Sequence, residues 1–199
     1  VINDKIAFAE LSNGDRIEGD HFISNAPPMQ TLDLIEGGNL RPAYKNRIRG
    51  LENTVSVFIV HIVFKKDTFK YLNKNYYYYA NNDVWAGVEY KEDEWPLGFA
   101  LFAPATSKSE IYADSVSVMC YMKYEEVKKW NNTFHTIPKN ISDRGDGYSE
   151  FKIEKSEKLI DLLENKFPGI RHKIKSYTST SPLSYRDYIG TSDGNLYGV

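Results

Sequence analysis

The segment Thr54–Phe64 limits the possible folds more than any other part of the sequence. It is apolar and β-branched over almost its whole length, which is typical of a strand inside a sheet. Because this apolar character is nearly continuous, the segment predicts a central strand with both faces covered. Two other apolar runs, residues 97–103 and 116–122, predict further strands.

Helical signals lie between and around these strands. Residues 150–167 place Leu159, Ile160, Leu163 and Phe167 at the spacing of one helix face. Shorter elements complete the pattern: helices over 29–36 and 42–49, and a hairpin of residues 5–11 and 16–23 around the turn Asn13-Gly14. Since strands and helices are interleaved without a regular β-α-β rhythm, the sequence predicts an α+β fold with a mixed or antiparallel sheet and helices packed on one side.

Several classes of function lack the residues that they need. The single cysteine, Cys120, lies in an apolar run and is expected to be a buried small hydrophobic residue. The four histidines show no metal-ligand spacing, so no metal site is predicted. The sequence contains no P-loop, no G-x-G-x-x-G turn and no G-x-S-x-G motif. A net charge of −2 argues against a nucleic-acid partner.

The sequence also bears on where the protein is located. It shows no signal peptide and no run of roughly 18 apolar residues that would span a membrane. The cytoplasm is therefore the predicted location, and peripheral association of a longer enzyme with a membrane stays open, as does the oligomeric state.

Tyrosine is unusually frequent, with 15 residues in a chain of 199. Tyrosine joins an apolar ring to a polar tip, so a tyrosine-rich chain can line a cleft for an apolar or planar ligand. It can equally use tyrosine on the half-buried faces of a sheet. Both interpretations stay open for the run of four tyrosines at residues 76–79.

The last residues, Thr178–Val199, are rich in hydroxyl groups, glycine and tyrosine, and their last part shows no helical or strand period. By composition they form a polar tail that carries several tyrosines, with turns at Gly190 and at Asp193-Gly194.

Three segments, in this order, resemble FAD-dependent phytoene desaturases, carotenoid isomerases and retinol saturases. The first is NGDRIEGDHFISNAPP at residues 13–28, the second is FPGIR at 167–171, and the third is SPLSYRDYIGTSDGNLYG at 181–198. The resemblance implies that the chain is the central part of such an enzyme, without the glycine-rich segments that hold most of the FAD. It assigns residues 1–27 to a hairpin edge of the FAD domain, 28–181 to the substrate-binding domain, and 182–199 to a connector toward a C-terminal FAD-binding segment.

The resemblance also implies site residues. By motif position, Asn25, Ala26 and Pro27 lie where the chain crosses between the two domains, and Tyr197 and Gly198 approach the isoalloxazine ring. These five residues are the predicted FAD contacts, although tight FAD binding by this chain alone is not expected. The predicted substrate contacts are apolar or aromatic: Val57, Ile59, Tyr77, Tyr79, Pro182 and Tyr185. No catalytic residue is assigned.

The resulting functional hypothesis is a substrate-domain fragment of an FAD-dependent oxidoreductase. Its substrate would be a long apolar molecule, such as a polyene, carotenoid or retinol, that is desaturated, saturated or isomerised. Whether this chain alone is an enzyme stays open, and the expectation is that it is inactive by itself. The alternative is a free-standing module that binds an apolar ligand or a protein without catalysis.

Overall fold

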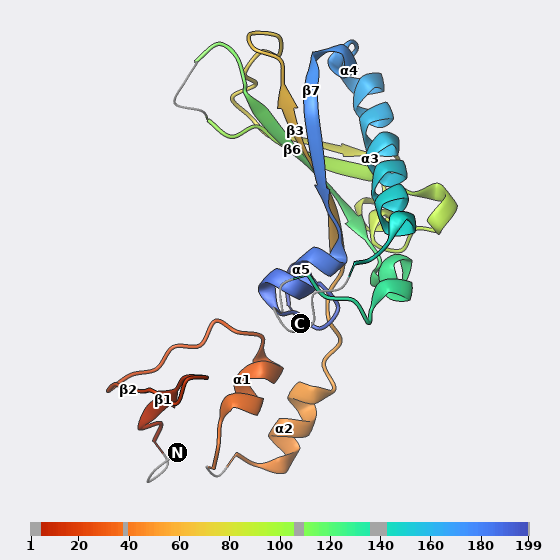
Figure 1. The fold of residues 1–199 in the computed structure, drawn as a ribbon. Coiled ribbons are helices and arrows are strands. Elements are labelled where there is room, and N and C mark those ends of the chain that lie inside the picture. Colours follow the sequence, from red (N-terminus) through yellow and green to blue (C-terminus); the bar gives the residue numbers. More distant parts are fainter. Residues whose placement is uncertain (1–4, 38–39, 106–109, 136–142, 199) are drawn as a thin grey trace. The chain divides into compact units, whose positions relative to one another are not determined.

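The computed structural model describes residues 5–37, 40–105, 110–135 and 143–198 (Figure 1). The chain divides into two compact units. The first contains the described residues up to Asn53 together with Gly198, and the second is Thr54–Tyr197. The assignment of residues 1–27, 28–181 and 182–199 to FAD-binding and substrate-binding domains stays a prediction.

The first unit follows the local signals of the sequence. Its elements are β1 (Phe8–Glu10), β2 (Arg16–Glu18), α1 (Pro28–Leu34) and α2 (Pro42–Arg49). The two strands pair antiparallel, and Gly14 in their turn has a φ of +88°, which glycine adopts without strain. Both helices have proline at an N-terminal position, where the missing N–H costs no helical hydrogen bond.

The second unit is built on a five-stranded sheet in the order β4-β5-β6-β3-β7, in which every strand pairs antiparallel with its neighbours. Its strands are β3 (Ser56–Phe64), β4 (Tyr76–Tyr79), β5 (Gly98–Phe102), β6 (Ser115–Met122) and β7 (Ile174–Thr180). Its helices are η1 (Val84–Gly87), η2 (Glu92–Glu94), η3 (Tyr124–Trp130), α3 (Asp146–Lys166), α4 (Ile170–Lys173) and α5 (Pro182–Ile189). The predicted α+β class is confirmed, and the sheet is antiparallel.

The long helix α3 covers one face of this sheet (Figure 1). Leu159, Ile160 and Leu163 are fully buried against the alternate residues of β3 that include Phe58 and Val60. Each fully buried aliphatic or aromatic side chain of this kind contributes about 1.5–3 kcal/mol relative to exposure. The predicted helix over residues 150–167 is therefore confirmed, and it begins earlier, at Asp146.

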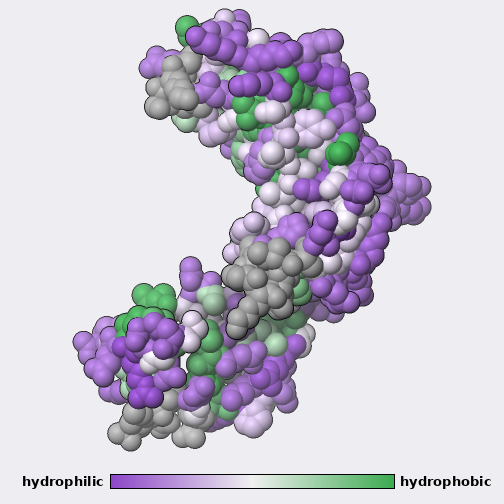
Figure 2. Space-filling view, viewed as in Figure 1, coloured by the Kyte–Doolittle hydropathy of each residue, from purple (hydrophilic) through white to green (hydrophobic). Residues whose placement is uncertain are grey.

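The prediction that β3 is covered on both faces is wrong for most of its second face, beyond Val57. Ile59 and His61 are only partly buried and Val63 is 42% exposed, whereas Phe58 and Val60 on the α3 side are fully buried. We call the face of the sheet opposite α3 the open face. In Figure 2 pale and green residues gather beside α3 with purple ones around them, and the surface over α3 is purple.

The tail from Thr178 is more regular than its composition predicts. Its first residues end β7, and residues 182–189 form α5, which begins with Ser181 as N-cap and ends at Gly190 with a φ of +82°. The Ser181 hydroxyl accepts a hydrogen bond from the Leu183 N–H at 3.2 Å. Pro182 and Leu183 are buried, so α5 is a packed part of the second unit.

The residues after α5 then return to the start of β3. Asn195 forms an antiparallel bridge with Ser56, and the Leu196 N–H donates to the Val55 carbonyl at 3.1 Å. The Ser56 hydroxyl also donates to the carbonyl of Gly194. These contacts hold Tyr197 beside the end of the sheet.

A buried ionic cluster joins α5 to the start of α3. The Asp187 carboxylate is fully buried and contacts the guanidinium groups of both Arg144 and Arg186. It also accepts a hydrogen bond from the His135 backbone N–H at 3.1 Å. Arg186 donates to the Asn131 carbonyl at 2.6 Å, so both arginines are anchored on the segment after η3.

A second buried ion pair lies under the middle of α3. Lys155 contacts Glu126 of η3, and their side chains are only 3% and 4% exposed. The Tyr90 hydroxyl donates to Glu126, and the Lys155 ammonium lies 4.8 Å from the centre of the Trp95 ring. Burial and the hydrogen bond to Glu126 raise the pKa of Tyr90, which therefore stays neutral.

Candidate functional site

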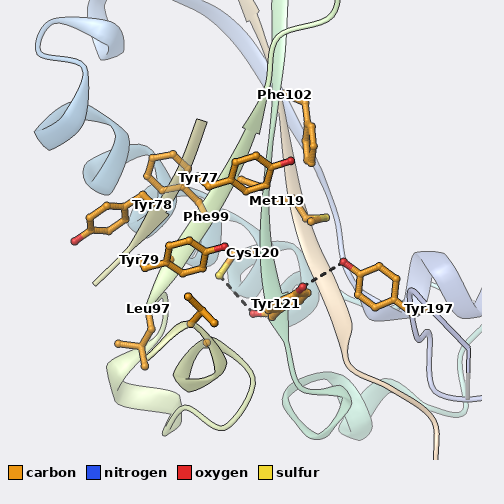
Figure 3. Close-up of a pocket in the computed structure, with 14 residues that line it drawn as sticks. Tyr77, Tyr78, Tyr79, Leu97, Phe99, Phe102, Met119, Cys120, Tyr121 and Tyr197 are labelled. Atoms are coloured by element: carbon orange, nitrogen blue, oxygen red, sulfur yellow. Dashed lines mark hydrogen bonds between the residues drawn. The ribbon is translucent and has the colours of Figure 1, made fainter. Parts of the chain in front are cut away.

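A cavity of about 170 Å³ lies on the open face of the sheet (Figure 3). Gly98 and Ala100 of β5 form its shallow floor, and aromatic rings surround it. The rings belong to Tyr77, Tyr79, Phe102, Tyr121 and Tyr197. The described side chains that line the cavity carry no formal charge, which is the lining expected for an apolar ligand.

The alternation of strand residues explains why these side chains meet. Successive residues of a strand point to opposite faces, and directly paired residues of neighbouring strands share a face. Tyr77 pairs with Ala100, Ala100 pairs with Met119, and Met119 pairs with Ile59. This row crosses four strands on the open face, and its small member, Ala100, leaves the space between the larger ones.

The four tyrosines of β4 are divided between the two faces. Tyr77 and Tyr79 lie on the open face, whereas the ring of Tyr78 packs on Phe99 with centroids 5.5 Å apart. Tyr76 packs edge-on against Phe167 at 5.2 Å. The two interpretations of the tyrosine run are thus both partly right: alternate residues line the cavity or pack in the core.

Tyr121 and Tyr197 form the main polar feature of the cavity. Their hydroxyl oxygens lie 3.2 Å apart, and their rings meet edge to face with centroids 6.4 Å apart. The hydrogen bond with Tyr197, together with partial burial, raises the pKa of Tyr121 to about 12. The Tyr121 phenol is therefore a neutral hydrogen-bonding group at physiological pH.

Cys120 lies at the base of the cavity but is not a nucleophile. Its side chain is buried, as predicted, and its thiol contacts the Tyr121 carbonyl at 3.4 Å. Burial, followed by the nearby Glu126 carboxylate, raises the pKa of this thiol. Because the thiolate is the reactive form, Cys120 is expected to be inert.

The structure brings together some of the predicted site residues. Tyr77, Tyr79 and Tyr197 line the cavity. Val57 and Ile59 belong to the same face, but neither lines the cavity and Val57 is completely buried. The remaining residues lie elsewhere: Pro182 and Tyr185 in α5, and Asn25, Ala26, Pro27 and Gly198 in the first unit.

Sequence reasoning missed the residues that shape the cavity between the tyrosines. Gly98, Ala100 and Phe102 alternate along β5, and Met119 and Tyr121 alternate along β6. The alternation of small and large residues in 98–102 was a usable signal for an open face with a depression. The pairing of Tyr121 with Tyr197 had no local signal, because the two are 76 residues apart.

Two helices of the second unit, α3 and α5, offer no ready site for the pyrophosphate of FAD. A dinucleotide pyrophosphate needs backbone N–H groups at a helix N-terminus. The longest helix, α3, begins with the acidic Asp146, and the Ser181 side chain already takes an N–H of α5. What the chain does offer is the uncharged aromatic surface of the cavity.

Two absences among the described residues bear on the site. They hold no group of three or more His, Cys, Asp or Glu residues that could bind a metal ion. None of their helices has the length and apolar character needed to cross a membrane.

The position of Tyr197 depends on Gly194. Gly194 has a φ of +57°, and a Cβ atom added there would lie 2.0 Å from the Pro182 carbonyl oxygen. We expect Gly194→Ala to detach residues 191–197 from β3 and to lower the free energy of unfolding by about 1–3 kcal/mol. Urea unfolding gives the energy, and amide hydrogen exchange at Leu196 reports the detachment.

Gly147→Ala is the matched control for this prediction. Gly147 lies in the first turn of α3, and an added Cβ would meet no atom within 4 Å. This change should be neutral or stabilise the helix by up to about 1 kcal/mol. Unchanged protection of the Leu196 amide in Gly194→Ala would contradict the proposed role of Gly194.

The chain is similar to curated proteins that share one name. The chain is 22% identical over 193 residues to human all-trans-retinol 13,14-reductase, and the match covers 89% of this chain and 31% of the human protein. It is 26% identical over 195 residues to the rat protein of the same name, with the same coverage. The chain thus spans about a third of the length of these relatives. No protein-family model matches the chain, and no solved structure matches it significantly.

Proposed function

We propose that the second unit is the substrate-binding part of an oxidoreductase that acts on a retinoid or a similar long apolar molecule. The observation that carries this proposal is the uncharged, aromatic cavity on the open face of the sheet. It occurs in a chain that is similar along most of its length to retinol reductases. The FAD implied by the sequence resemblance would be held largely by residues outside this chain.

The size of the cavity indicates how much of a ligand this chain could hold. Complete pockets for small molecules have volumes of about 300–1,000 Å³, and this cavity has about 170 Å³. It therefore accommodates a section of a long ligand rather than the whole. Burial of roughly 200 Å² of apolar ligand surface contributes about 5 kcal/mol before the cost of association. Binding by this chain alone is expected to be weak but measurable.

The substitution Ala100→Phe tests this proposal. A phenyl ring at position 100 would fill the space between Tyr77 and Met119, because Ala100 lies between them on the open face. We expect about tenfold weaker binding of all-trans-retinol, since exclusion of roughly 60 Å² of apolar contact corresponds to about 1.5 kcal/mol. The fluorescence of retinol itself, titrated with protein, measures the affinity.

Thr178→Phe is the matched control. Thr178 pairs with His61 on the same open face but is exposed on β7 and does not line the cavity. Its substitution adds the same ring to the same face and should leave the retinol affinity unchanged. Equal affinities of both variants and the original chain would place retinoid binding elsewhere and overturn the proposal.

A further inference from the structure

We propose that the hydroxyl pair of Tyr121 and Tyr197 is the alcohol-binding end of the cavity, which takes a hydroxyl group of the substrate. This inference rests on the proposed function, because it assumes that the cavity binds the apolar part of the same molecule. It goes further by naming the two residues that would orient the molecule and the polar group that they would select.

The placement of the two hydroxyl groups is the first observation. In Figure 3 the Tyr121 and Tyr197 hydroxyls point toward one another at one end of the cavity, Phe102 lies farther from them, and Met119 lies in between. A ligand that packs its apolar part over Ala100 and Met119 would bring one end to this pair. The site therefore has an apolar body and a polar end.

The hydrogen-bonding capacity of the pair is the second observation. A phenol has one O–H donor and also accepts, so one hydroxyl donates to the other across 3.2 Å and the second O–H stays available. Within the described part of the chain, neither hydroxyl has another protein acceptor. The contact is longer than the 2.7–2.8 Å typical of O–H···O bonds. A ligand hydroxyl could insert beside the pair, accepting from one phenol and donating to the other.

The electrostatics of the cavity favour an alcohol over an acid. The described lining has no cationic side chain that would compensate a carboxylate, and a poorly hydrated charge without a partner is costly. The raised pKa of Tyr121 keeps its hydroxyl neutral and able to donate. An ether can only accept from the pair, and a hydrocarbon makes no hydrogen bond with it.

Contacts outside the cavity hold Tyr121 and Tyr197 in position. Tyr197 is 60% exposed, but the chain before it is fixed by the Asn195 bridge to Ser56 and by the close approach of Gly194 to Pro182. Tyr121 lies on β6, in the interior of the sheet. The two hydroxyls are thus positioned by different elements that the fold brings together.

Binding of three related probes to this chain tests the inference: all-trans-retinol, its methyl ether, and the corresponding hydrocarbon without oxygen. One hydrogen bond contributes about 1 kcal/mol net, which is about a fivefold change in affinity. We expect the original chain to bind retinol about fivefold tighter than the hydrocarbon, with the ether between them. Tyr121→Phe and Tyr197→Phe should each weaken retinol binding about fivefold and leave hydrocarbon binding unchanged.

Tyr188→Phe is the control, because Tyr188 is a 74% exposed phenol on α5 and does not line the cavity. Equal weakening of retinol and hydrocarbon binding in the Tyr121 and Tyr197 variants would show a packing role and overturn the inference. Retinol binding that is unaffected by either variant would also overturn it, while the proposed function would stand. If no probe binds the original chain, the proposed function itself fails, and the inference fails with it.

Discussion

Asp187→Asn is expected to lower the free energy of unfolding of the second unit by about 3–5 kcal/mol at pH 7. The substitution keeps the side-chain size but leaves the guanidinium groups of Arg144 and Arg186 buried without a carboxylate. Loss of one partner of a buried ion pair typically has this cost. All three tryptophans, Trp85, Trp95 and Trp130, belong to the second unit, so urea unfolding followed by tryptophan fluorescence measures the effect.

The effect should depend on pH in a defined direction. Burial alone would raise the pKa of Asp187, but hydrogen bonds from Arg186, the His135 N–H and Arg144 outweigh it and hold the pKa below its usual range. A carboxyl whose pKa is lowered in the folded state stabilises the fold above its unfolded pKa of about 3.9. That stabilisation is lost as the pH falls through the lower folded pKa. The difference between the original chain and Asp187→Asn should therefore shrink below about pH 4.

An exposed aspartate provides the control. Asp161 pairs with Arg171, but its side chain is 69% exposed, and exposed pairs contribute about 0–1 kcal/mol. Asp161→Asn should have only this small effect. A stability difference for Asp187→Asn that is the same at pH 7 and pH 3 would show that the ionised carboxylate is not its cause.

Lys155→Met is expected to have a comparably large effect, again about 3–5 kcal/mol. It leaves the Glu126 carboxylate buried beneath α3 with its Tyr90 hydrogen bond but without its cation. Methionine keeps most of the apolar stem of lysine, so the loss reports the charge rather than a cavity. Tryptophan fluorescence is again a suitable probe, because the Lys155 ammonium lies over Trp95.

Two further variants separate the charge from the packing. Lys158→Met removes an exposed helix pair with Glu154, at 2.9 Å, and should cost less than about 0.5 kcal/mol. The double change Lys155→Met with Glu126→Leu removes both buried charges and should recover much of the lost stability. Equal costs for Lys155→Met and Lys158→Met would mean that the buried pair has no special role.

Local chemistry was enough to predict much of the fold. The turn at Asn13-Gly14, the helix at residues 42–49 and the apolar runs that became β5 and β6 each carry their own signal. The α+β class followed from their order. Which faces of β3 are covered did not follow from local signals, because a strand's own sequence does not show whether another element packs against it. Ile59 and Val63 are apolar but partly exposed, because no long helix among the described elements covers the open face as α3 covers the other.

Helix α5 was missed for a different physical reason. α5 has only 8 residues, too few for a helical period to be recognised in its sequence. Its end signals were present: Ser181 before Pro182 at the start, and Gly190 after the end. The side chains of β7 on the open face are polar, so its sequence resembles that of a loop rather than that of a strand. The cavity depends on the pairing of strands distant in sequence, which no local pattern specifies.

The division of the sheet into a covered and an open face has a consequence for the effect of substitutions in its strands. Side chains that stabilise the second unit, such as Leu159 and Phe58, lie on the α3 side, whereas Tyr77, Ala100 and Tyr121 contact the cavity. Because neighbouring residues of each strand face opposite sides of the sheet, substitutions at alternate positions can change the shape of the cavity without disturbing the core. The shape of the cavity and the stability of the second unit can therefore vary independently.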